Sequence, residues 1–187
     1  KESLSIHEKL IVILDMGSKI QQCINTDEYD NIKSVVNDYL KEGIAHTLDE
    51  TRNLSDSGQF EDISLQQGIR QILYPYEEME VLNPEWEVIL KDIIDSLFEQ
   101  MSDEEYNILN EEFGTYMVSR AYEYRQLLEY LVFRYFAKSI YDYDFLGKCQ
   151  MLVTNFFVIR QMDIIRWLDN HREYSFKDRM DVVHIFS

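Results

Sequence analysis

The sequence has 187 residues, with 18 basic and 35 acidic side chains, which gives a formal net charge of −17. A protein that wraps nucleic acid neutralises phosphates with lysine and arginine, so this charge excludes that class of function and we expect no nucleic-acid partner. The chain is 45% hydrophobic and 13% aromatic, with 6 glycines and 2 prolines. It is therefore too rich in core-forming residues to be disordered, and we expect one globular domain or two small ones.

The first residue is Lys1, and no signal-peptide pattern follows it, so we expect the chain to be a fragment of a longer protein. No stretch of about 18 uncharged apolar residues occurs, and we expect a soluble protein without a membrane partner. Cys23 and Cys149, the only cysteines, lie in apolar helical patterns and are predicted to be buried thiols; a disulfide or ligand role is the alternative. A reducing, cytoplasmic location fits this cysteine usage.

The first 43 residues predict a helical hairpin. Ser5 and Glu8 have the spacing of a capping box, so a helix is expected to start there. Its apolar positions follow the 3.6-residue period: Ile6, Leu10, Ile13, Leu14, Ile20 and Ile24. A turn at 25–27 then leads into a second amphipathic helix, which is expected to end at Gly43.

The middle of the chain predicts a loop followed by three helices. Polar and small residues dominate positions 46–59, and a short helix is expected from about Ile63 to Leu73, where Tyr74 and Pro75 should stop it. Asn83 and Pro84 form a cap and a first helical position, and the apolar face that follows extends to Met101. A second capping box, Ser102 to Glu105, opens an acidic helix that Gly114 is expected to close.

The last third of the chain predicts two long helices and a terminal one. The long segments cover about 116–141 and 145–169, and residues 142–144 join them. Both are apolar on more than one face, as in a helix that neighbours touch from several sides, so we expect their rings to pack together as the core. A final helix starts near Ser175.

Charge is unevenly distributed along the sequence. Residues 1–115 hold 8 basic and 26 acidic side chains, whereas residues 116–187 hold 10 and 9 and carry 16 of the aromatic side chains. We therefore expect an all-α fold, an irregular multi-helix bundle of about seven helices. In it, an acidic N-terminal lobe (1–115) docks on an aromatic-rich C-terminal helical core (116–187), and the two form one compact unit.

Sequence motifs for metal or phosphate chemistry are missing. The four histidines have no i, i+3 or i, i+4 spacing, so no metal site is predicted, and the glycines form no phosphate-binding loop. Asp142 and Asp144 resemble the start of a calcium loop, but Leu146, Lys148 and Val153 occupy its later ligand positions. No catalytic residue is therefore assigned.

One cluster of aromatic and charged residues remains. Its candidate substrate or interface residues are Arg134, Tyr135, Tyr141, Asp142, Asp144, Lys148, Arg160 and Asp163. These form either a packed core whose polar groups reach carboxylates or the surface, or a pocket in which carboxylates and rings receive a cation such as lysine. Arg134 lies in an apolar pattern, so a buried partner such as Asp142, Asp144 or Asp163 is predicted for it.

Three segments of this part of the chain, 122–136, 141–144 and 157–163, resemble the C-terminal helical region of the flagellin-lysine N-methylase family. Residues 8–14 and 28–30 are also similar to the helix that follows the family's cysteine-rich region. The resemblance covers most of the chain. The resemblance assigns six residues of this chain to family motifs, without a known role: Arg134, Tyr135, Asp142, Asp144, Arg160 and Asp163. Members of the family often have a small residue between the two acids that correspond to Asp142 and Asp144, whereas this chain has Tyr143.

The resemblance implies a bacterial, cytoplasmic protein related to enzymes that methylate flagellin lysines with S-adenosylmethionine. Such proteins carry an N-terminal cysteine cluster suited to an iron–sulfur centre, whereas two separated cysteines cannot supply the usual four thiolates. We therefore expect no cofactor in this fragment. Its expected partner is a cysteine-rich N-terminal segment, and flagellin is a further candidate.

Two functional hypotheses follow. In the first, this is a supporting or substrate-presenting helical domain of a lysine methylase, without catalysis of its own. In the second, it is a helical adaptor or small-ligand-sensing domain, which a buried apolar cavity without a charged mouth would favour.

Overall fold

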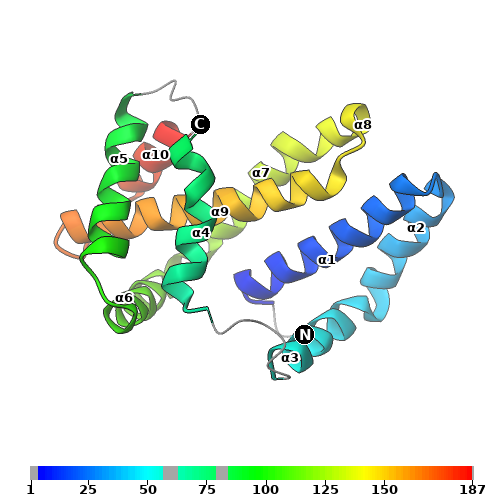
Figure 1. The fold of residues 1–187 in the computed structure, drawn as a ribbon, viewed down its shortest axis with the longest axis horizontal. Coiled ribbons are helices and arrows are strands. Elements are labelled where there is room, and N and C mark those ends of the chain that lie inside the picture. The colour runs from blue at the N-terminus through cyan, green and yellow to red at the C-terminus, as the bar shows by residue number, and fades with distance from the viewer. Residues whose placement is uncertain (1–3, 57–62, 79–83, 187) are drawn as a thin grey trace. The chain divides into compact units, whose positions relative to one another are not determined.

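The computed structural model describes residues 4–56, 63–78 and 84–186. Throughout these ranges the regular secondary structure is helical, which confirms the predicted all-α class (Figure 1). None of the helices in these ranges is long and apolar enough to cross a membrane.

The predicted capping box starts the first helix, α1 (Ile6–Asn25). The Ser5 hydroxyl accepts a hydrogen bond from the Glu8 backbone amide at 3.2 Å, and the Glu8 carboxylate accepts one from the Ser5 amide at 2.9 Å. Two backbone donors that the helix leaves unpaired are thereby satisfied.

The second helix does not end at Gly43. After α2 (Tyr29–Asp38) the chain makes one π-helical turn, η1 (Tyr39–Gly43), and continues as α3 (Ile44–Asp56). The predicted loop over 46–59 is thus wrong for residues 46–56, and 57–59 lie outside the described residues. The polar composition was misleading because Thr47 and Leu48 are buried, so tertiary contacts hold this segment in a helix.

Two other predicted helix ends are also wrong. Helix α4 (Leu65–Glu78) contains Pro75, which occupies its last turn. Helix α6 (Asp103–Tyr116) begins at the predicted Ser102 capping box but continues through Gly114. A Cβ at Gly114 would lie 3.8 Å from the Arg160 guanidinium, so this glycine lies at a helix contact rather than at a cap.

Helix α5 (Pro84–Ile94) starts at the predicted proline, and a π-helical turn, η2 (Asp95–Glu99), extends it. The proposed cap Asn83 lies outside the described residues.

The first of the two long segments is broken. It consists of a 3₁₀ turn η3 (Met117–Arg120), α7 (Ala121–Tyr135), a second 3₁₀ turn η4 (Phe136–Lys138) and the short α8 (Ser139–Asp142). The second long segment is continuous, as predicted, and forms α9 (Phe145–Asp169); α10 (Phe176–Phe186) follows after Ser175. From Asn155 to Ile164 every α9 residue except Phe157 is buried, as expected for a helix touched from several sides.

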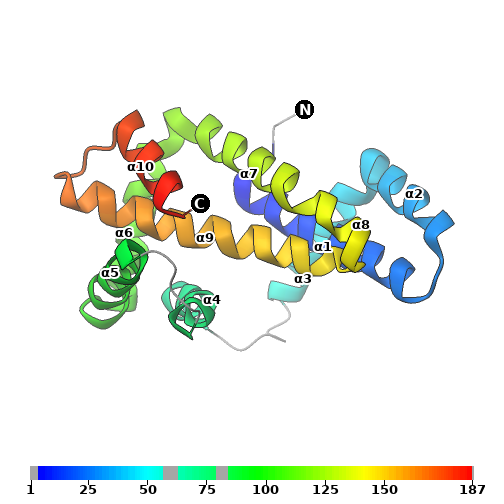
Figure 2. The same cartoon turned by 90° about the horizontal axis from the view of Figure 1, so that it is seen from above.

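The described residues form two compact units, each made from two stretches of sequence. The first combines residues 4–56 with 122–153, and the second combines 63–78 and 84–121 with 154–186. In the first unit α1 packs against α2 and α3 (Figure 2). In the second, α4 packs against α6, and α5 against α10. The boundary between units falls inside α9, whereas the predicted division at residue 115 followed charge and stays a prediction.

Candidate functional site

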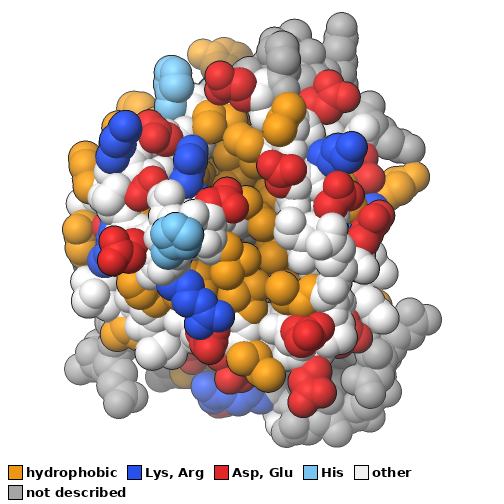
Figure 3. All heavy atoms as spheres, turned by 90° about the vertical axis from the view of Figure 1, so that its left-hand side faces the viewer, with side chains coloured by type: hydrophobic (Ala, Val, Ile, Leu, Met, Phe, Trp, Pro, Cys, Tyr) orange, Lys and Arg blue, Asp and Glu red, His pale blue; other side chains and the backbone are white. Residues whose placement is uncertain are grey.

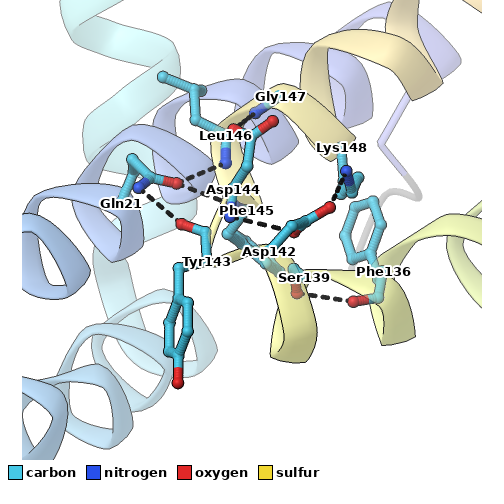
Figure 4. Close-up of polar contacts among 10 residues, drawn as sticks. All are labelled: Gln21, Phe136, Ser139, Asp142, Tyr143, Asp144, Phe145, Leu146, Gly147 and Lys148. Carbon is cyan, nitrogen blue, oxygen red and sulfur yellow. Dashed lines mark hydrogen bonds and ion pairs between the residues drawn. The ribbon is translucent and has the colours of Figure 1, made fainter.

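The turn between α8 and α9 brings together three of the predicted site residues (Figure 4). The Lys148 ammonium lies 2.5 Å from the Asp142 carboxylate, and the other carboxylate oxygen accepts a hydrogen bond from the Asp144 amide at 3.2 Å. The hydrogen bond from Lys148, followed by that from the Asp144 amide, lowers the pKa of Asp142 from its ordinary value. Asp142 is therefore ionised near neutral pH and fixes the turn.

Asp144 caps the first turn of α9. Its carboxylate accepts a hydrogen bond from the Gly147 amide at 2.9 Å. A Cβ at Gly147 would lie well within contact distance of that carboxylate, so glycine leaves room for the cap. An acidic side chain at this position also interacts favourably with the positive end of the helix dipole.

Gln21 of α1 stabilises the same turn through hydrogen bonds, although no sequence motif identified it as a site residue. Its amide oxygen accepts hydrogen bonds from the Phe145 and Leu146 amides at 2.8 and 3.1 Å. Its amide nitrogen donates to the Tyr143 carbonyl at 3.0 Å (Figure 4). The only sequence signal was a neutral polar residue inside a helix, which is too common to indicate a long-range cap.

Gln21 thereby holds Tyr143 in a left-handed backbone conformation, with φ of 56°. The preceding turn of the same unit, between α1 and α2, also contains a left-handed residue, Asp27, with φ of 57°. Asn and Asp adopt this region readily, but a tyrosine adopts it at a conformational cost. The contacts of Gln21 offset that cost.

Tyr29, Asp27 and Tyr143 form what we call the tyrosine–aspartate cluster. The Tyr29 hydroxyl donates to the Asp27 carboxylate at 3.3 Å. Desolvation raises the pKa of Tyr29, and the nearby Asp27 and Tyr143 raise it further. The Tyr29 and Tyr143 side chains are 48% and 58% exposed, so both rings are accessible. Residues 27–31, Tyr29 among them, line an open depression of about 380 Å³.

Arg134 does not occupy the predicted buried position. Its side chain is exposed, and the expectation of a buried guanidinium is wrong. The guanidinium avoids the cost of burial because it interacts with rings at the surface: it donates to the Tyr130 hydroxyl at 2.6 Å and lies 5.7 Å from the centre of the Tyr135 ring. The bond to Tyr130 raises the pKa of Arg134. Tyr141 is 86% exposed.

The remaining two predicted residues, Arg160 and Asp163, belong to the second unit. Asp163 is fully buried and does pair with a buried arginine, but this is Arg179, at 2.6 Å. The Asp163 carboxylate also accepts a hydrogen bond from the Tyr174 hydroxyl. Arg160 donates to the Asn110 side chain at 2.9 Å. These contacts of Arg160 and Asp163 are those of a packed interior.

The second unit also exposes a groove of about 200 Å³ between α5, α9 and α10, with both apolar and charged side chains in its lining. Figure 3 shows a band of hydrophobic side chains on one face of the molecule, bordered by acidic side chains and, along one side, also by Lys, Arg and His. The groove is lined by Ile89, Asp92, Met162, Ile165, Arg166, Asp169, Val182 and Ile185. Its charged side chains distinguish it from the uncharged apolar cavity that would favour an adaptor.

An iron–sulfur cluster does not fit the residues of this chain. Cys23 and Cys149 are buried, as predicted, and both are free thiols. Burial, followed by the charge of Asp144, raises the pKa of Cys149 to about 11, so it is a protonated thiol near neutral pH. Two thiols cannot supply four thiolate ligands, and no group of three or more metal-binding side chains occurs within residues 4–56, 63–78 and 84–186.

Comparison with known proteins identifies a family. A family model described as the FliB lysine N-methylase C-terminal domain matches residues 1–187. No protein with a curated description and no solved structure matches the chain.

Proposed function

Because the chain belongs to the FliB lysine N-methylase C-terminal domain family, we propose that it is a helical domain that presents a lysine-bearing segment of flagellin for methylation. In this proposal the domain binds and orients the substrate. Methyl transfer from S-adenosylmethionine is carried out by another part of the methylase, in the bacterial cytoplasm.

The observation that supports substrate binding is the tyrosine–aspartate cluster. Tyr29 and Tyr143 offer ring faces that attract an ammonium group, and Asp27 offers a carboxylate beside them. Tyr29 is the first residue of α2 and Tyr143 lies in the turn before α9, and the Gln21 contacts fix that turn relative to α1. A preorganised site of this kind loses little conformational entropy when it binds a lysine side chain.

Charge complementarity also supports a lysine-bearing partner. The chain has a formal net charge of −17, and residues 28 and 30, next in sequence to Asp27 and Tyr29 of the cluster, are also acidic. A field of this sign attracts a basic segment and raises its association rate, an effect that falls with added salt.

The binding test uses a flagellin peptide with one lysine and the same peptide with that lysine acetylated. We expect the lysine peptide to bind the 187-residue chain more tightly, by about 5-fold or more, because acetylation removes the charge that the rings and Asp27 attract. Tyr143→Leu and Asp27→Asn should each remove most of this preference. Isothermal titration calorimetry at low salt measures it.

Tyr122→Leu is the matched control, since Tyr122 is exposed on α7 in the same unit but lies outside the cluster. It should bind like the unchanged chain. Equal binding of the two peptides, or equal losses from Tyr122→Leu and Tyr143→Leu, would contradict the proposal.

The second test concerns catalysis. The 187-residue chain is incubated with flagellin and S-adenosylmethionine, and lysine methylation is measured by mass spectrometry. We expect none, and methylation restored when the cysteine-rich N-terminal segment of a family member is added. Robust methylation by the chain alone would refute a purely presenting role.

A further inference from the structure

The π-helical turn η1 sets the register of α3 against α1. One oxygen of the Asp15 carboxylate accepts hydrogen bonds from Tyr39, from Thr47 at 2.6 Å and from Lys19 at 3.0 Å. In a regular α-helix each residue rotates the side-chain direction by about 100°, so side chains eight residues apart point about 80° away from each other. The extra residue of a π turn reduces this angle to about 20°, so the Tyr39 and Thr47 side chains can reach the same carboxylate.

Gly43 fits the narrow geometry of this turn. A Cβ at Gly43 would lie 3.1 Å from the Asp38 carbonyl oxygen, closer than most such contacts. A π turn inside a long helix is less stable than regular helix, and such turns occur often at functional sites.

A pocket lies against this turn. Its volume of about 640 Å³ is typical of small-molecule sites. Its lining residues are Lys19, Val35, Asp38, Tyr39, Lys41, Gly43 and His46. Val35 and the Tyr39 ring supply apolar walls.

Two lysines line this pocket of an acidic chain, and one of them, Lys19, is paired with Asp15 at 3.0 Å. Lys41 makes no ion pair or hydrogen bond with another described residue, and Lys19 lies 5.2 Å from the centre of the Tyr39 ring. The hydrogen bond with Tyr39 is the largest effect that raises the pKa of Lys19, so this lysine is charged. His46 faces Glu50 at 3.0 Å, and Asp38 is the acidic residue among those that line the pocket.

We propose that this pocket binds a small organic anion with a flat apolar body, such as an aromatic carboxylate. The anionic group pairs with Lys41, with His46 and Lys19 nearby, and the body packs against the face that Val35 and Tyr39 share. The pocket shares no residue with the tyrosine–aspartate cluster, and its ligand is independent of the proposed function.

The test is a titration of the ¹⁵N-labelled chain with benzoate, followed by NMR. We expect millimolar binding with shifts of amides in residues 35–46, and at least about 5-fold weaker binding of benzyl alcohol, which lacks the charge, and of acetate, which lacks the ring. Lys41→Gln should weaken benzoate binding at least about 5-fold. Lys33→Gln, which removes an exposed lysine of α2 outside the pocket, should leave it unchanged.

Three results would overturn the proposal. If benzyl alcohol bound as tightly as benzoate, the cations would not recognise the ligand. If acetate bound as tightly as benzoate, the apolar walls would not contribute to binding. Equal losses in Lys41→Gln and Lys33→Gln would indicate a general charge effect rather than a site.

Discussion

At the scale of single residues, Gly17 permits a close approach that no larger residue allows. A Cβ at this position of α1 would lie 2.7 Å from the Cys149 sulfur of α9, far inside van der Waals contact. Both residues are buried, and Cys149 has no exposed surface into which it can move. Interiors are packed as densely as organic crystals, so one methyl group here has to displace its neighbours.

We therefore predict that Gly17→Ala destabilises the fold by about 1 kcal/mol. Overpacking costs about 1 to 3 kcal/mol, and the better helix propensity of alanine offsets about 1 kcal/mol of that. Urea denaturation measures the change. The double variant Gly17→Ala, Cys149→Ala should show a favourable coupling of about 1 kcal/mol, because the smaller side chain relieves the clash.

Gly68 provides the matched control. It lies in α4, and a Cβ there would meet nothing within 4 Å. Gly68→Ala should therefore stabilise the chain by about 0.5 to 1 kcal/mol through helix propensity alone. If both alanine variants changed stability in the same direction, the steric account of Gly17 would be wrong.

At the scale of helices, Asp15 connects α1 to the π turn through Tyr39 and to α3 through Thr47. Burial by itself would raise the pKa of Asp15, but hydrogen bonds from Thr47, Tyr39 and Lys19 together outweigh it and bring the pKa below its ordinary value of 3.8. The folded state thus binds this proton more weakly than the unfolded state does. Its contribution to stability is complete above pH of about 5, where the unfolded-state carboxyl is ionised, and is lost as the pH falls through the folded pKa.

We predict that Asp15→Asn lowers the free energy of unfolding by about 1 to 2 kcal/mol at pH of about 7, as for other hydrogen bonds to a charged group. The difference from the unchanged chain should stay constant above pH of about 5 and shrink as the pH falls to below about 3, since protonation removes the same charge. Urea denaturation across this pH range measures it. A difference that stays constant with pH would contradict the assignment.

Between α8 and α9, a different kind of contact fixes the backbone. Gln21 bonds to three backbone groups of residues 143, 145 and 146, so a side chain of α1 takes the place of the missing intrahelical partners at the start of α9. This contact explains why the chain turns sharply at Tyr143 rather than continuing as one long helix.

At the scale of the whole molecule, the two units depend on different polar interactions. In the second unit the buried Asp163 carboxylate joins Arg179 of α10 to α9. Removing one member of a buried ion pair leaves the other uncompensated, which costs about 3 to 5 kcal/mol. Asp163→Asn should lower the free energy of unfolding by this amount.

Hydrogen exchange with mass spectrometry should show that Asp163→Asn loses protection in α6, α10 and residues 154–169. The change in α1 to α3 should be smaller, because locally destabilised regions open first. The double variant Asp163→Leu, Arg179→Met should recover most of the stability, since an apolar pair has no buried charge to compensate. Loss of protection confined to α1 to α3 would contradict this account.

Local sequence signals were sufficient to predict the helical class and the starts of several helices. Capping boxes at Ser5 and Ser102 are signals of this kind, because the side chains and the backbone groups that they satisfy lie within three residues of each other. Pro84 is another, because its fixed φ suits a first helical position, where no amide donor is needed. Burial of Cys23 and Cys149 followed from the apolar helical pattern in the same way.

Which polar residues are buried, and where helices continue, depended instead on contacts between distant parts of the chain. Arg134 and Arg179 both lie in amphipathic patterns, yet the first is exposed against rings and the second pairs with Asp163. Helix α3 persists through a polar stretch because Thr47 bonds to Asp15, 32 positions earlier. A hydrogen bond or ion pair between distant residues depends on how the helices pack, and no local pattern of sequence records that packing.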